Sequence, residues 1–295
     1  MSDTRTAARH ILEPHEWTAR EELHRRRAAR FLEPHEQRAR AGQPHPVWDF
    51  LFTYYSFKPR QLRRWHPGFG VGLRGADHYL GRGGYDCRDG VVSVTDEHLA
   101  ARLDTVEFIA GLLAATTARA PRLNCFGLHE WAMVYRAPQP RHDQVPLRLG
   151  TAGTDAVVES MPLRCSHFDA YRFFTLDAVG RNSEQLSRTS QAAHEQPGCV
   201  HVSMDLYKWS YKLGPLVESE LVMDCLDLAA DARMLDMRAS PYDLAGYGIT
   251  PIEIEAAGGR AEYVRIQQDI ARRATPLRAR LLAGCQALLA YGGRR

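Results

Sequence analysis

The segment CSHFDAYRFF, residues 165–174, places a thiol, an imidazole, a carboxylate, a phenol and a guanidinium close together. If 168–174 is a strand, alternate side chains share a face, and His167, Asp169 and Tyr171 form one polar row. Such a row can transfer a proton or bind a ligand. We therefore take His167 and Asp169 as candidate catalytic residues. The alternative is a core strand with one solvated face.

A second segment, MDLYKWSYK at 204–212, places Asp205 near Tyr207 and Trp209. A carboxylate beside aromatic rings suits a flat, electron-poor ligand, which stacks on the rings. In a strand all three side chains share a face, whereas in a helix Tyr207 leaves it. Asp205 is the second candidate catalytic residue, and Tyr207, Trp209 and Trp131 are candidate stacking residues. The alternative is a half-buried aromatic segment.

Three cysteines stand shortly before histidines, in the pairs Cys125 and His129, Cys165 and His167, and Cys199 and His201. Zinc accepts both kinds of ligand, although these three spacings differ and match no standard chelating hairpin. The local order His167-x-Asp169 also occurs in iron sites built from two histidines and a carboxylate. An alternative site is therefore an iron or zinc centre held by His129, His167, Asp169 and His201.

The predicted helix at 216–239 carries four carboxylates on one stripe, at Glu220, Asp224, Asp227 and Asp231. Carboxylates stacked on one helix face repel each other unless cations meet them. One interpretation is a solvated face, or a face paired with arginines of the terminal helices. The other is a metal-binding face, although the stripe contains no histidine, which helical metal sites usually include.

The remaining pattern indicates which elements position these residues. Predicted helices cover 13–41 with a break near Pro34, 45–57, a short basic stretch before Pro67, 95–113 capped by Thr95, 216–239 and 258–289. Predicted strands lie at 91–94 and near 131–136, 156–164 and 168–174, while 201–213 is ambiguous between helix and strand. The sequence thus predicts an α+β fold, a predominantly α-helical single domain over 1–295 with a few short strands.

Composition places the chain among ordinary globular proteins, with 295 residues, 44% of them hydrophobic and 25% charged. The net charge of +3 is unevenly distributed. Residues 1–70 hold 13 Lys/Arg against 8 Asp/Glu, and residues 260–295 hold 8 Arg against 2 acids. Basic ends suit phosphate contacts, for which Arg63 and Arg64 are our candidates. The alternative is that these arginines only solvate helix faces.

The N-terminal segment MSDTRTAARH is polar, and no apolar run approaches the about 20 residues of a membrane helix. We expect no membrane partner. The six cysteines are dispersed and form no CxxC pair, as expected for reduced thiols of a cytoplasmic protein. The sequence gives no indication of the oligomeric state.

Five segments carry a resemblance to a known family: DFLFTYYSFKPRQLRRWHPG (49–68), CFGLHEWAMVYR (125–136), LRCSHFDAYRFFT (163–175), MDLYKWSYKL (204–213) and LDMRASPYDL (235–244). Together they resemble an actinobacterial family usually labelled 3-methyladenine DNA glycosylase, over about residues 13–285. The resemblance implies a DNA-repair hydrolase that binds DNA and releases an alkylated purine without a cofactor.

Under this interpretation one carboxylate, Asp169 or Asp205, stabilises positive charge on the sugar while the base is turned out of the duplex. The three aromatic candidates stack on the base, and the two arginines hold phosphate. The alternative is a metal-dependent enzyme, with iron or zinc, that acts on a small molecule. A third possibility is a non-catalytic nucleotide- or nucleic-acid-binding protein.

Overall fold

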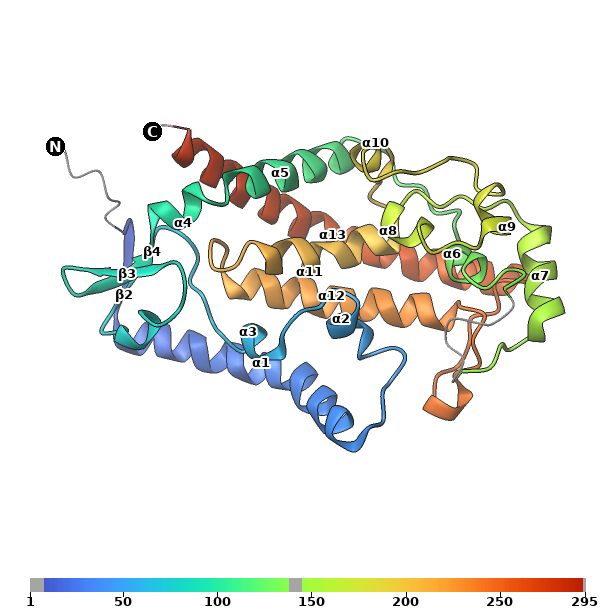
Figure 1. Cartoon of the computed structure of the whole chain (residues 1–295), viewed down its shortest axis with the longest axis horizontal. Helices are drawn as coiled ribbons and strands as arrows, with labels where there is room; N and C mark the ends of the chain where they lie inside the picture. The colour runs from blue at the N-terminus through green and yellow to red at the C-terminus, as the bar shows by residue number, and fades with distance from the viewer. Residues whose placement is uncertain (1–7, 138–144, 294–295) are drawn as a thin grey trace. The chain divides into compact units, whose positions relative to one another are not determined.

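The computed structural model describes residues 8–137 and 145–293. Within these ranges the chain forms thirteen α-helices, two short 3-10 helices and four strands (Figure 1). The longer helices are α1 (Pro14–Ala41), α5 (Leu103–Thr117), α7 (Gly150–Ser160), α11 (Val200–Lys212), α12 (Ser219–Arg238) and α13 (Ala257–Gly292). The short helices are α2 (Phe50–Thr53), α3 (Pro59–Leu62), α4 (Asp96–Ala100), α6 (Leu128–Ala132), α8 (Phe168–Tyr171), α9 (Leu176–Val179) and α10 (Gln191–His194). The predicted predominantly helical α+β fold is confirmed.

The chain divides into two compact units. Of the described residues, the first unit contains 8–111, 206–227 and 277–293, and the second contains 112–137, 145–205 and 228–276. Each boundary falls inside a helix, namely α5, α11, α12 or α13, rather than in a linker. The single domain over 1–295 stays a prediction.

The first unit contains the sheet, in the order β1-β2-β4-β3. Its strands are β1 (His10–Leu12), β2 (Val71–Arg74), β3 (Tyr85–Arg88) and β4 (Val91–Val94). β1 pairs with β2 in parallel, and the other two pairings are antiparallel. Figure 1 shows the sheet beside the N-terminal end of α1, where the Trp17 indole N–H donates to the Arg74 carbonyl over 3.0 Å. The strand at 91–94 was predicted, whereas β1, β2 and β3 were not.

The helix α1 runs without a break through Pro34, contrary to prediction. Glu13 and Glu16 form a capping box at its start, and Gly42 ends it in the left-handed conformation, at φ 65°. Ala28 and Leu32, in the turn before Pro34, are fully buried. Burial on this face keeps the helix continuous despite the hydrogen bond that proline cannot donate.

Two other helices of the first unit are shorter than predicted. Only Phe50–Thr53 of the predicted helix 45–57 is helical. The predicted helix 95–113 is divided into α4 and α5. The predicted cap is confirmed, because the Thr95 hydroxyl accepts the His98 backbone N–H over 3.1 Å.

In the second unit, three segments predicted as strands form helices instead. The predictions for 131–136, 156–164 and 168–174 were wrong, since α6, α7 and α8 overlap these segments and none of β1 to β4 lies in them. α6 and α8, with five and four residues, are too short for the apolar period to distinguish them from strands. His167, Asp169 and Tyr171 therefore do not form one row on a strand.

The ambiguous segment 201–213 is almost entirely the helix α11. The predicted helices 216–239 and 258–289 are confirmed as α12 and α13. Among the described residues, none of the helices combines the length and apolar character that a bilayer crossing requires. Figure 1 shows the short helices α6, α8, α9 and α10 gathered near α7, and all five belong to the second unit, which also contains the candidate site.

Candidate metal centre

Seven side chains of the second unit form a buried polar cluster, which we call the His–carboxylate cluster. Its members are His129 and Glu130 from α6, His167 just before α8, Glu195 just after α10, His201 and Asp205 from α11, and Asp236 from α12. None of them is more than 5% exposed. A cluster of this composition inside a protein core points to a function other than packing, because buried polar groups are costly.

Four of the seven residues form a first group, namely His129, Glu130, His201 and Asp236. One ligand atom from each lies within 4.8 Å of the others. The Asp236 carboxylate lies between two imidazoles: its Oδ1 is 2.7 Å from His129 Nε2, and its Oδ2 is 3.8 Å from His201 Nε2. Carboxylate and imidazole atoms at this separation can share one metal ion.

The other three residues form a second group with the same spacing, namely His167, Glu195 and Asp205. His167 Nε2 lies 3.2 Å from Asp205 Oδ2 and 3.6 Å from Glu195 Oε1. The Gln191 side-chain amide donates to Glu195 Oε1 over 2.6 Å and so orients that carboxylate. This group therefore offers two carboxylates and one imidazole to a cation.

The two groups are neighbours along α11. His201 belongs to the first group and Asp205 to the second, one helical turn apart. The rings of His167 and His201 stack with centroids 5.2 Å apart and an interplanar angle of 21°. The helix thus presents one ligand to each of two adjacent sites.

Cationic groups lie among the carboxylates of the cluster. It contains four buried carboxylates, and Arg233 of α12 is a buried cation recorded against two of them. The Arg233 Nη1 lies 3.1 Å from Glu130 Oε1 and 3.2 Å from Asp236 Oδ2. Arg233 is fully buried, so its charge acts through a medium of low dielectric constant. The guanidinium therefore stabilises the carboxylates of Glu130 and Asp236.

Proton affinities in the first group reflect this environment. Burial disfavours the charged imidazolium of His129, but the adjacent Asp236 outweighs it and raises the pKa of His129 well above its ordinary value. Burial also disfavours the charged Asp236 carboxylate, but His129, His201 and Arg233 hold its pKa well below the usual range. These two side chains therefore form a buried ion pair in the absence of a metal.

The other two members of the first group shift toward their neutral forms. Burial and the charge of His129 lower the pKa of His201 to about 3, so its imidazole is neutral at pH 7. Its Nδ1 has no hydrogen-bond partner among the described residues. Burial, and then Asp236, raise the pKa of Glu130. A neutral imidazole is the form that binds metals.

Local sequence explains how α6 reaches the cluster. Gly127 precedes the helix with φ 75°, and a Cβ there would lie 3.2 Å from the Ala239 Cβ. Glycine is needed both for this backbone angle and for the close approach. The indole N–H of Trp131 donates to the Ala239 carbonyl over 2.8 Å and fixes the helix against the end of α12. His129 and Glu130 lie between these two anchors.

The segment that carries His167 is held by a buried asparagine. The Asn182 side chain accepts the Cys165 backbone N–H over 2.8 Å and donates to the Cys165 carbonyl over 3.0 Å. This pairing fixes the extended chain two residues before His167. It also explains why a segment rich in polar side chains is buried without disrupting the core.

A cavity of about 10 Å³ adjoins the first group, large enough for about one water molecule. Its lining includes His129, His201 and Tyr263, together with the thiols of Cys125, Cys165 and Cys199. Burial raises the pKa of Tyr263 well above its ordinary value and that of Cys165 likewise. The phenol and this thiol are therefore uncharged, and the cavity admits a molecule of the size of water.

Three residues of the predicted metal site do come together, but the fourth does not. His129, His167 and His201 belong to the cluster, and the candidate Asp205 joins them. Asp169 is buried elsewhere and pairs with Arg188 over 2.6 Å, as well as with Arg172 over 3.5 Å. Its carboxylate is engaged by guanidinium groups, so the set His129, His167, Asp169 and His201 is not a single site.

The candidate stacking residues are largely buried. Trp131 and Tyr207 are fully buried, and Trp209 is 6% exposed. In the first unit, the Tyr207 ring packs edge-on against Phe57 with centroids 5.3 Å apart. Rings enclosed in this way present no open face to a base in this conformation, and their role in substrate binding stays a prediction.

The candidate phosphate contacts have different surroundings. The Arg63 guanidinium pairs with Glu36 over 2.6 Å on the surface of the first unit. Arg64 instead lines a cavity of that unit. The two adjacent arginines therefore do not act as one pair, and their contact with DNA phosphate stays a prediction.

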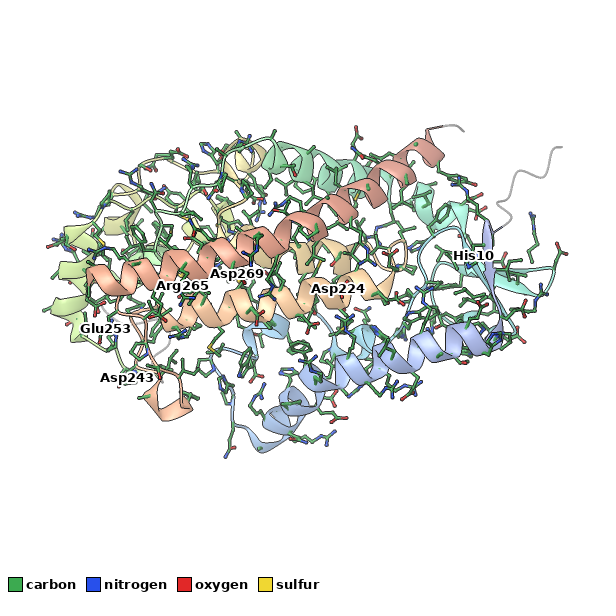
Figure 2. All side chains as sticks on the ribbon, turned by 180° about the vertical axis from the view of Figure 1, so that it is seen from behind. His10, Asp224, Asp243, Glu253, Arg265 and Asp269 are labelled. Carbon is green, nitrogen blue, oxygen red and sulfur yellow. The ribbon has the colours of Figure 1, made fainter. Side chains whose placement is uncertain are left out.

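The acidic stripe of α12 is paired with arginines, as one of the two interpretations predicted. In the first unit, Arg20 contacts Glu220 over 2.8 Å, and Arg27 contacts both Asp224 and Asp227, over 2.9 and 2.7 Å. Asp224 is labelled on α12 in Figure 2. In the second unit, Arg273 of α13 contacts Asp231 over 2.5 Å. These carboxylates form ion pairs with α1 and α13.

Sequence reasoning missed Glu130, Glu195, Asp236 and Arg233. Adjacent residues of a helix do not usually share a face, yet α6 is short and both His129 and Glu130 reach the cluster. Asp236 lies within LDMRASPYDL, one of the segments that carry the family resemblance. Glu195 has no local signal in the sequence.

Comparison of this chain with family models, with curated proteins and with solved structures gives no match.

Proposed function

We propose that the protein is a metal-dependent enzyme that acts on a small molecule, with its metal held by the His–carboxylate cluster. The observation that carries this proposal is the composition and spacing of the cluster: four carboxylates and three imidazoles, all buried, with their ligand atoms in two groups that each lie within 4.8 Å. Buried carboxylates are costly unless cations meet them. Divalent cations bound in these two groups would stabilise the carboxylates.

The donor set favours iron or manganese over a structural zinc site. Both groups combine carboxylate and imidazole, and neither includes a thiolate. Helical proteins with two iron or manganese ions use a similar mixture of carboxylates and histidines projecting from several helices. We therefore infer two adjacent ions, one held by His129, Glu130, His201 and Asp236, and the other by His167, Glu195 and Asp205.

Bound iron would supply Lewis-acid and redox chemistry at this position. The protein's own residues provide the conditions for it. Burial of the cluster excludes bulk water, Gln191 orients Glu195, and Arg233 holds Glu130 and Asp236 in place. The small cavity beside His129 and His201 suits a co-substrate of the size of water or dioxygen.

The family resemblance supports the cluster as the functional site. Its segments 125–136, 163–175, 204–213 and 235–244 contain five of the seven cluster residues. A DNA glycosylase is the second candidate, and it would use Asp205 of the same cluster as its carboxylate. The two candidates differ in whether activity requires a metal.

Metal titration separates them. After chelation and buffer exchange, the protein is titrated with Fe(II) without oxygen, with Mn(II) and with Zn(II), and heats of binding are measured. Saturation near two ions per chain is expected for the wild type, and Asp205→Asn should remove about one of them. Asp169→Asn is the matched control, because Asp169 is also buried but lies outside the cluster.

The same preparations are assayed for free 3-methyladenine released from methylated DNA. Release by the chelated protein, together with no binding of any of the three metals, would contradict the metal-dependent proposal and favour the glycosylase. Metal binding without base release would support an enzyme of another substrate class.

A further inference from the structure

The first unit contains a separate cavity that the proposed metal centre does not use. Its volume is about 390 Å³, within the range of about 300–1,000 Å³ that is usual for small-molecule sites. Six of its lining residues carry basic side chains: His24 of α1, Arg64 and His66 after α3, Arg82, His98 of α4, and Lys212 of α11. We call this the basic cavity.

The lining of the basic cavity contains no aspartate or glutamate among the described residues. Arg82, one of the lining residues, pairs with Glu21 over 3.7 Å. Glu220, which influences His24, is engaged by Arg20 over 2.8 Å. Burial lowers the pKa of His24, His66 and His98, so the positive charge of the cavity comes from Arg64, Arg82 and Lys212, and an anion is the ligand that this charge favours.

His24 gives an independent indication of a ligand. It is only 3% exposed and lines the cavity. Its Nε2 lies 2.8 Å from the Leu62 carbonyl oxygen, so this nitrogen carries a proton and donates. Its Nδ1 has no hydrogen-bond partner among the described residues. A buried polar atom without a partner is unusual and calls for a ligand or a bound water.

Arg64 provides a charge that no carboxylate neutralises. No ion pair of its guanidinium is recorded within the described ranges, whereas its neighbour Arg63 pairs with Glu36. Arginine presents a planar fork of donors that matches the oxygens of phosphate. The cavity is thus lined by a guanidinium that is available to a ligand and by the unpartnered His24 nitrogen.

An apolar wall completes the basic cavity. The rings of Phe57 and Tyr211 stack with centroids 3.8 Å apart, and both residues line it. Charged donors together with an aromatic wall suit a ligand that has both an anionic and an organic part.

We propose that the basic cavity binds a small phosphate monoester, with Arg64 as a ligand to the phosphate group and His24 Nδ1 accepting a hydrogen bond from a hydroxyl of the ligand's organic part. Binding is independent of the metal centre of the second unit. The cavity has room for a small molecule, so we favour a free phosphate ester over the phosphate backbone of DNA.

The test is isothermal titration calorimetry of the full chain with glycerol 3-phosphate, inorganic phosphate and, for comparison, acetate. The wild type should bind both phosphate compounds saturably and acetate at least about tenfold more weakly, because a single carboxylate engages fewer donors. Arg64→Gln should weaken binding of glycerol 3-phosphate by about tenfold or more. His24→Gln should also weaken it.

Arg60→Gln is the matched control, since Arg60 is an exposed arginine of α3 that does not line the cavity. It should bind as the wild type does. Arg64 is half-buried at the cavity, so its variant should fold, and circular dichroism checks all three substituted proteins. If the wild type binds no phosphate compound, or if Arg64→Gln binds as tightly as Arg60→Gln, the proposal is wrong. Displacement of glycerol 3-phosphate by a short DNA duplex, with tighter binding of the duplex, would also overturn it.

Discussion

Two sets of four carboxylates in this chain are neutralised in different ways. The stripe of α12 comprises Glu220, Asp224, Asp227 and Asp231, each with an arginine partner. The His–carboxylate cluster contains Glu130, Glu195, Asp205 and Asp236, with Arg233 recorded against two of them. The carboxylates of the stripe pair with arginines, whereas those of the cluster lie among three histidines and one arginine.

The difference in burial explains why the two sets need different partners. Side chains of the stripe are 28% exposed at Glu220 and 54% at Asp231, so water and salt screen their charge. Cluster residues are at most 5% exposed, and water cannot screen them. Surface ion pairs can thus stabilise a stripe of acids on a helix. A buried set of four carboxylates instead requires closely bound cations, or protons that convert the carboxylates to neutral carboxyl groups.

The largest expected effect is on metal affinity. It is measured by removing one carboxylate of the cluster and, separately, one carboxylate of the stripe, both on α12. Asp236→Asn should lower the affinity for the first metal ion by about 100-fold or more, because Asp236 contacts two imidazoles of the first group. Competition with a fluorescent chelator measures this affinity.

Asp231→Asn is the matched control, five residues away on α12 and exposed. It should keep the affinity of the wild type. An equal loss of metal affinity in both variants would mean that either substitution disturbs α12 as a whole. No loss of affinity in either variant would show that Asp236 is not a metal ligand. Thermal unfolding confirms that each variant is folded.

Asp49, in the first unit, provides an intermediate case. It is 8% exposed, nearly as buried as the cluster, and two basic side chains contact it: His35 Nδ1 lies 2.8 Å and Arg38 Nε 3.1 Å from Oδ1. Burial alone would raise the pKa of Asp49, but Arg38, His35 and the His45 backbone N–H outweigh it and lower the pKa. Its stabilising contribution is therefore present above the unfolded pKa of about 3.9, and it is lost as the pH falls through the lower folded pKa.

We expect Asp49→Asn to lower the free energy of unfolding at pH 7 by about 1.5–3 kcal/mol, the usual contribution of hydrogen bonds to a charged group. The difference from the wild type should shrink below about pH 4 as the native carboxylate takes up a proton. Urea unfolding at pH 7 and pH 3 measures both values. A difference that stays constant over this range would show that the charge of Asp49 is unimportant.

The smallest change in the free energy of unfolding is expected for a substitution in the stripe of α12. Asp224 contacts Arg27 over 2.9 Å and Arg280 over 3.0 Å, but about a third of its side chain is exposed. Asp224→Asn should lower the free energy of unfolding by less than about 1 kcal/mol, and by less still in about 0.5 M salt. A loss of several kcal/mol in urea unfolding would mean that the stripe is as critical as the buried cluster.

The parts of the fold predicted from sequence are those with long, regular patterns. The helices at 216–239 and 258–289 repeat their apolar positions over many turns, and both are present. The cap at Thr95 was also predictable, because hydroxyl side chains favour that position. α6 and α8 were taken for strands, since each is only about one turn long and tertiary packing decides its conformation.

The sequence predicted only those residues of the candidate site that stand in a distinctive local pattern. Histidines 129, 167 and 201 stood out because each follows a cysteine closely, and Asp205 stood out beside aromatic residues. Asp236 contacts His129 across 107 residues of sequence. A local pattern cannot show that such distant residues meet, and Asp169 looked equivalent to Asp205 until its pairing with Arg188 was visible.

The central claim is that the buried carboxylates are neutralised by metal ions, and the metal content of the purified protein tests it most directly. The wild type and Asp236→Asn are produced in medium with iron, manganese and zinc, purified without chelators, and analysed by inductively coupled plasma mass spectrometry. We predict about two equivalents per chain in the wild type, mainly iron, and clearly less in the variant. A wild-type protein with less than about 0.1 equivalent of any transition metal, which also takes up none on reconstitution, would contradict the account. The cluster would then be neutralised by protons, as coupled buried carboxyl groups can be.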